Sequence, residues 1–130
     1  MNRLIKTNKL GLKCEILISD FNDWQNREIY IELIENFLND KIDVKEFEKK
    51  FLSLWKSNLD EDKSWERFVY IINNFKLNQF QGFSSLISKL FTDLEVLEPD
   101  LFLRQDYEIG EDDFRECLKK ILIEIKNRYS

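Results

Sequence analysis

The chain contains no histidine, and it has only three glycines, one proline and two cysteines in 130 residues. Without histidine it lacks the usual general base, the commonest metal ligand and the base of nucleophilic triads. Phosphate-binding motifs of the GxxxxGK or GxGxxG kind do not occur either. We therefore expect no enzymatic activity, no metal site and no cofactor. A small enzyme would need a buried pair of acids with a raised pKa, and the sequence identifies none.

The scarcity of glycine and proline also predicts the fold class. Folds rich in β-structure need many tight turns, and tight turns use these two residues. Hydrophobic residues make up 43% of the chain and charged residues 35%, as is typical of a globular domain. We predict one all-α domain, a compact antiparallel helical bundle of four to five helices.

Long apolar runs and paired cysteines are also missing. Cys14 and Cys117 form no CxxC motif, so we expect free, buried thiols in a reducing compartment. No run of about 18 apolar residues could form a transmembrane helix. The basic start of the chain, residues 1–6, lacks the apolar stretch of a secretory signal. These features predict a cytoplasmic protein that does not bind membranes.

Apolar residues recur at intervals of three and four in five segments, as on one face of an α-helix. Capping residues mark where these helices start: Asp23 or Asn26, Asp43, Ser64, and Ser84 or Ser85. Pro99 is expected to end the fourth helix. The predicted helices span residues 26–39, 43–55, 64–75, 84–98 and 111–128.

The first 25 residues are expected to form an extension packed on a bundle made by residues 26–130. Residues 12–19 are rich in β-prone side chains and could pair with residues 4–6 as a short hairpin. An irregular arm laid against the bundle is the alternative.

The negative charge is concentrated in one segment. The formal net charge is −5, yet residues 93–113 contain nine acidic side chains and one basic side chain, Arg104, for a net charge of −8. Three of the acids, Glu111, Asp112 and Asp113, fall in the first turn of the last predicted helix, where they offset its positive dipole end. The other six have no such local reason, and we predict that they bind a partner: Asp93, Glu95, Glu98, Asp100, Asp106 and Glu108.

Carboxylates repel nucleic acid and anionic lipid, so the expected partner is a basic protein surface. Calcium is not expected, because the acids lack the alternating spacing of a calcium loop. An ion pair of Arg104 with neighbouring acids is expected to fold the loop.

Short motifs follow one another in a particular order over residues 28–58 and 84–127. These are NFLNDKI at 36–42, EFE at 46–48, FLSLW at 51–55, LFTD at 90–93, EPD at 98–100, Arg104, YEI at 107–109 and the helix at 114–125. Together, and in this order, they resemble the colicin D immunity-like family.

This resemblance implies a helical bundle that neutralises a cognate ribonuclease toxin, of the tRNA-cleaving kind used by colicins and contact-dependent inhibition systems. Acidic side chains would cover the basic active site of the toxin and imitate the tRNA phosphates. The sequence departs from the family at residues 1–25, at an extra helix over 64–81 and at the apolar residues 101–103. A helical adaptor for another basic protein is the alternative, and an exposed surface around Trp24 or Trp65 would favour it.

Overall fold

The computed structural model describes residues 11–59 and 61–129. Within these ranges the chain forms six α-helices and one short 3-10 helix, with an isolated β-bridge and no β-strand. The all-α prediction is therefore confirmed. The elements are α2 (Leu12–Gln25), α3 (Arg27–Leu38), α4 (Val44–Leu59), α5 (Trp65–Asn74), η1 (Leu77–Gln79), α6 (Phe83–Glu95) and α7 (Glu111–Arg128).

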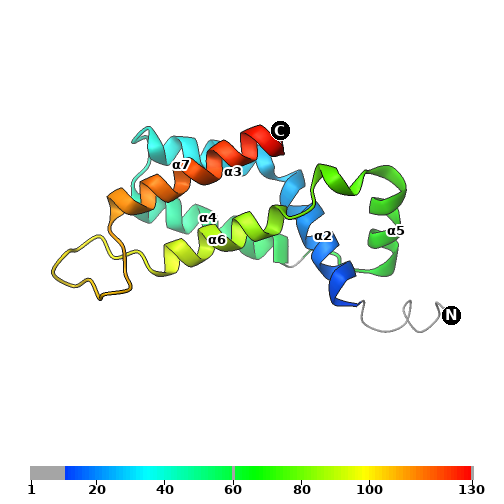
Figure 1. The fold of residues 1–130 in the computed structure, drawn as a ribbon, viewed down its shortest axis with the longest axis horizontal. Coiled ribbons are helices and arrows are strands. Elements are labelled where there is room, and N and C mark those ends of the chain that lie inside the picture. The colour runs from blue at the N-terminus through cyan, green and yellow to red at the C-terminus, as the bar shows by residue number, and fades with distance from the viewer. Residues whose placement is uncertain (1–10, 60, 130) are drawn as a thin grey trace.

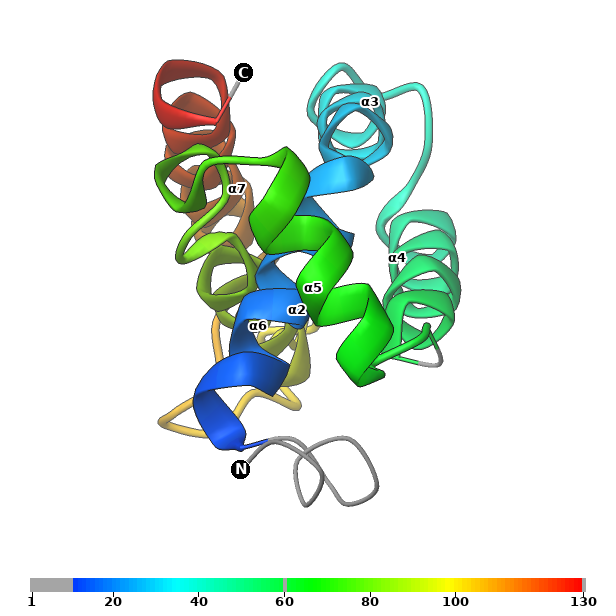
Figure 2. The same ribbon diagram turned by 90° about the vertical axis from the view of Figure 1, so that its right-hand side faces the viewer.

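Four helices form an antiparallel bundle, and two more close one of its ends. Figure 1 shows α3 and α6 running in one direction along the long axis, and α4 and α7 returning. Seen from the right-hand end of Figure 1, α5 lies in front of α2, and α2 lies across the ends of the other four helices (Figure 2). The short connection between α3 and α4 makes them antiparallel neighbours, as the sequence predicts.

Phenylalanine side chains fill the centre of the bundle. The ring of Phe47 lies 5.1 Å from that of Phe37 and 5.8 Å from that of Phe114, so these three residues join α3, α4 and α7. Near the other end of the bundle, Phe83 meets Tyr129 edge to face at 5.0 Å. All five rings are buried, and burial of one such side chain contributes about 1.5–3 kcal/mol.

Side-chain caps begin two helices at the predicted positions. Asp43 Oδ1 accepts a hydrogen bond from the backbone N–H of Glu46 at 2.8 Å, at the start of α4. Ser64 Oγ accepts one from the N–H of Arg67 at 3.1 Å, at the start of α5. Such a bond satisfies one of the free amides in a first helical turn.

The start of α6 differs from the prediction that Ser84 or Ser85 opens it. The helix begins at Phe83, after Gly82, whose φ of +87° is the left-handed conformation that glycine adopts easily. The cap comes from another helix, because the Asp20 carboxylate of α2 accepts hydrogen bonds from the amides of Gly82 at 2.9 Å and Ser84 at 2.8 Å. The helix ends at Glu95, before it reaches Pro99.

The hairpin prediction is wrong for residues 12–19, which belong to α2; its other strand, residues 4–6, lies outside the described residues. Cys14, Ile18 and Phe21 recur at helical spacing and pack into a second apolar cluster with Ile71 of α5 and Phe80. Burial of this stripe outweighs the modest preference of β-branched residues for strands. The described residues therefore contain one helix more than the four to five predicted, and the additional helix is α2. The division of the chain into an extension over residues 1–25 and a bundle over residues 26–130 stays a prediction.

Candidate binding surface

Most of the acidic segment lies at the end of the bundle opposite α5. At this end Figure 1 shows the last turn of α6, the first turn of α7, the loop between them and the connection from α3 to α4. The loop spans residues 96–110 and projects beyond the helices (Figure 1).

Backbone hydrogen bonds close the loop at its base. The N–H of Glu98 donates to the carbonyl of Ile109, and the N–H of Ile109 donates to the carbonyl of Val96, both at 2.8 Å. Leu97 and Ile109 form the isolated parallel bridge between the two sides. A loop with joined ends has fewer conformations to lose when it binds a partner.

The side chain of Arg104 also bonds the backbone where the two ends of the loop meet. Its Nε donates to the carbonyl of Glu98 at 3.0 Å, and one terminal nitrogen donates to that of Pro99 at 3.4 Å. The predicted ion pair with neighbouring acids is not found in the described part of the chain; Arg104 bonds carbonyl oxygens instead. Its guanidinium fills the place of a side chain at Gly110, where an added Cβ would lie 2.5 Å from a guanidinium nitrogen.

Three of the six predicted binding acids also order the loop. Asp100 Oδ1 accepts from the N–H of Phe102 at 2.9 Å, and Glu108 Oε1 accepts from the N–H of Gln105 at 2.7 Å. A longer bond of 3.4 Å joins Glu98 Oε2 to the N–H of Asp100. Each carboxylate uses one oxygen in this way, so its charge stays at the surface while its position is fixed.

The remaining three predicted acids divide into two groups. Glu95 and Asp106 are exposed. The Asp93 side chain is only 17% exposed and pairs with Lys89 at 3.3 Å. The pKa of the Cys117 thiol is raised, mainly by burial and further by the Asp93 charge. The fold therefore presents Asp93 less openly than the exposed acids Glu95, Asp100 and Asp106.

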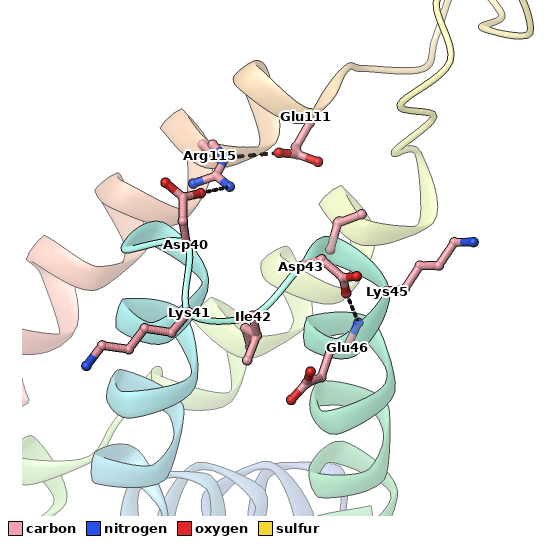
Figure 3. Close-up of a pocket in the computed structure, with 9 residues that line it drawn as sticks. Asp40, Lys41, Ile42, Asp43, Lys45, Glu46, Glu111 and Arg115 are labelled. Atoms are coloured by element: carbon pink, nitrogen blue, oxygen red, sulfur yellow. Dashed lines mark hydrogen bonds and ion pairs between the residues drawn. The ribbon is translucent and has the colours of Figure 1, made fainter.

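An open hollow of about 670 Å³ adjoins the first turn of α7. Figure 3 shows Arg115 between two carboxylates on its rim, and the dashed lines mark its bonds to Asp40 at 2.8 Å and Glu111 at 3.2 Å. Lys41 and Lys45 extend outward on opposite sides of this region (Figure 3). The acids here are largely balanced by bases, so the hollow adds little net charge.

Two buried acids in α2 were not identified from the sequence. Asp20 is 3% exposed, and all its hydrogen bonds go to the start of α6, including one from the Ser84 hydroxyl. Asp23 is 8% exposed, and burial, with the nearby Asp20 charge, raises its pKa to about 6 although a bond from Asn58 lowers it.

Asn58 connects Asp23 to two other polar side chains. Its amide nitrogen donates to Asp23 at 2.9 Å and to the Tyr30 hydroxyl at 2.8 Å, and its oxygen accepts from Asn26 at 3.0 Å. Burial and the Asp23 charge raise the pKa of Tyr30. The hollow beside this network is about 20 Å³, room for about one water and no substrate. The Asp23 network therefore serves the packing of the fold, and Asp20 serves as the cap of α6.

Neither tryptophan that could favour an adaptor forms an exposed surface. Trp24 is half-buried, its indole N–H donates to the carbonyl of Tyr129 at 3.1 Å, and the Arg27 guanidinium lies 4.1 Å above its ring. Trp65 is also half-buried and packs on Phe68. Both cysteines are free thiols and only partly buried.

The described residues contain no group of three or more acids or cysteines placed to hold a metal ion. Among the same residues, no helix has both the length and the apolar character needed to span a bilayer. No curated protein and no solved structure matches the chain significantly. The family described as bacterial self-protective colicin-like immunity matches residues 28–125, from α3 through the acidic loop into α7. The chain therefore belongs to the bacterial self-protective colicin-like immunity family, and this membership implies a toxin protein as its binding partner.

Proposed function

We propose that this immunity protein neutralises a cognate ribonuclease toxin, a tRNase, by covering the toxin's basic active site with the acidic end of its bundle. The observation that carries the proposal is the net charge of −8 in residues 93–113, most of it on a closed loop and the first turn of α7. The resemblance to the colicin D immunity-like family supports tRNA as the substrate of the toxin. The proposal places the protein in the cytoplasm, where tRNA is present.

Charge explains why such a surface suits a ribonuclease. A protein that binds RNA must attract phosphates, so its active site is lined with basic side chains. Exposed carboxylates such as those of Asp100 and Asp106 meet that site with the same sign of charge as RNA. The immunity protein itself would repel RNA, so the interaction is between two proteins.

The order of the loop supports tight binding. Three acids bond the loop backbone and Arg104 bonds its base, so little conformational freedom remains to be lost on association. Attraction between opposite surfaces speeds the encounter, and partner choice comes from shape and from like charges placed together in wrong pairs.

Inhibition of tRNA cleavage tests the proposal. The nuclease domain of the cognate toxin would be titrated with the immunity protein, and we expect cleavage to stop at one equivalent. More of a variant with Asp100→Asn and Asp106→Asn should be needed for the same inhibition, because both side chains keep their shape and lose their charge.

The matched control neutralises two exposed acids away from the loop, Glu66 in α5 and Glu124 in α7, by Glu→Gln changes. This control should inhibit like the parent. Equal inhibition by the loop variant and the control would contradict the assignment of the surface. Cleavage that continues in excess parent protein would contradict the proposed function.

A further inference from the structure

The loop of residues 96–110 has an apolar tip that is exposed and is not part of the core. This apolar tip consists of Leu101, Phe102, Leu103 and Tyr107, whose side chains are 67%, 95%, 63% and 71% exposed. Phe102 is the most exposed of the large hydrophobic residues in the described ranges. Single exposed apolar residues are ordinary on protein surfaces, but a cluster on one loop is typical of an interaction site.

Hydrogen bonds fix the tip in one conformation. The carboxylate of Asp100 accepts a hydrogen bond from the N–H of Phe102 at 2.9 Å. The backbone carbonyl of Asp100 accepts another from the N–H of Leu103 at 3.1 Å. One residue on, the N–H of Arg104 donates to the carbonyl of Leu101 at 3.4 Å. The turn therefore holds the Phe102 ring in solvent, and no residue within the described ranges covers this ring.

The charge around the tip limits what can cover it. Asp100 and Asp106 lie beside the apolar tip in the chain, and Glu98 and Glu108 lie close by. Arg104 is the one basic residue among them, and its side chain bonds the carbonyl of Glu98, where the two ends of the loop meet. A second copy of this chain would bring like charges together, and an anionic membrane would repel the loop. A basic protein with an apolar recess fits both the charge and the exposed ring.

We infer that the apolar tip is the anchor of the toxin interface, with Phe102 inserted into an apolar recess beside the toxin's basic active site. This inference rests on the proposed function and adds a second element to it. The carboxylates govern how fast the partners meet and how strongly salt weakens the encounter. The buried ring governs how slowly they separate, as aromatic residues at interface centres do.

The test compares two single variants for binding to a catalytically inactive form of the cognate toxin nuclease domain. Phe102→Ala removes the proposed anchor, and its wild-type side chain is so exposed that the fold should not change. Ile123→Ala is the matched control, since Ile123 is a 59% exposed residue on α7, outside the loop. Calorimetry at several salt concentrations would give the dissociation constant and its salt dependence, and sedimentation of the free chain would give its oligomeric state.

We expect Phe102→Ala to weaken binding by about 30-fold or more, the effect of an interface hot spot, mainly through faster dissociation. Its salt dependence should equal that of the parent, and Ile123→Ala should bind like the parent. Phe102→Leu should fall between the parent and Phe102→Ala.

Three results would overturn the inference. If Phe102→Ala binds with the affinity of the parent, Phe102 is not the anchor, and the proposed function still stands. If the parent does not bind the toxin, both the inference and the proposed function are contradicted. Self-association of the free chain that disappears in Phe102→Ala would assign the tip to a second copy instead.

Discussion

Replacement of Asp23 by asparagine should stabilise the fold at neutral pH. The Asp23 carboxylate is buried, and the one hydrogen bond that it accepts from the described residues comes from Asn58 Nδ2 at 2.9 Å. Burial raises its pKa from 3.8 to about 6, which means that the ionised form is disfavoured in the folded state. Asparagine removes the charge, keeps the shape and keeps an oxygen that can accept the same hydrogen bond.

The pKa change fixes the size and the sign of this effect. Between pH 3.8 and about 6 the folded chain binds a proton at Asp23 that the unfolded chain has lost, so stability falls as pH rises through this window. Each pKa unit corresponds to 1.36 kcal/mol, so ionised Asp23 costs the fold about 3 kcal/mol above pH 6. Asp23→Asn should therefore be more stable than the parent by about 3 kcal/mol at pH 7.5, and by less than about 1 kcal/mol at pH 4.

Urea unfolding followed by tryptophan fluorescence at these two pH values measures both differences. Asp106→Asn is the matched control, because Asp106 is exposed and its loss should change stability little at either pH. A stability gain in Asp23→Asn that is the same at both pH values, or a loss at pH 7.5, would refute the reasoning about burial.

Three further changes test how the scaffold holds its parts. Asp20→Ala should destabilise the fold by about 3 kcal/mol, because it leaves the amides of Gly82 and Ser84 without their acceptor; a change below about 1 kcal/mol in urea unfolding would refute the cap. Ser64→Ala removes a single capping bond and should cost about 1 kcal/mol by the same measurement; no loss would show that the hydroxyl does not cap α5. Arg104→Ala should speed hydrogen exchange at the loop amides and leave α3 unchanged; unchanged exchange in the loop would contradict its role in holding the base.

Much of the helical frame could be predicted from the sequence. Asp43 and Ser64 stand directly before amphipathic segments, and local spacing alone is enough to place such caps. The last helix begins at Glu111 and ends at Arg128, as its apolar stripe and charged ends predict. These features are local, so one segment of the chain contains all the information.

The features that could not be predicted depend on distant contacts. The run Ile16, Leu17 and Ile18 has the composition of a strand. In the fold, Leu17 and Ile18 pack in the cluster with Ile71 of α5 and Phe80, whereas Ile16 stays exposed. Asp20 caps a helix more than 60 residues away, and Asn58 bonds Asp23 across 35 positions. No spacing rule in the sequence connects these partners.

The charge of the candidate binding surface can be predicted from the sequence, but its geometry cannot. The acidic excess in residues 93–113 marks the loop from composition alone. Local charge does not reveal that the Asp93 side chain is only 17% exposed, that Arg104 bonds carbonyl oxygens, or that Phe102 projects into solvent. These properties follow from how the loop closes on its own base.

Competition between this chain and tRNA tests the central claim most directly. A catalytically inactive form of the cognate toxin nuclease would be loaded with labelled tRNA and titrated with the immunity protein, and the bound tRNA would be followed by fluorescence anisotropy. Occlusion of the active site predicts that one equivalent displaces the tRNA completely, and that excess tRNA raises the apparent dissociation constant in proportion. A stable complex containing toxin, tRNA and immunity protein together would contradict the account.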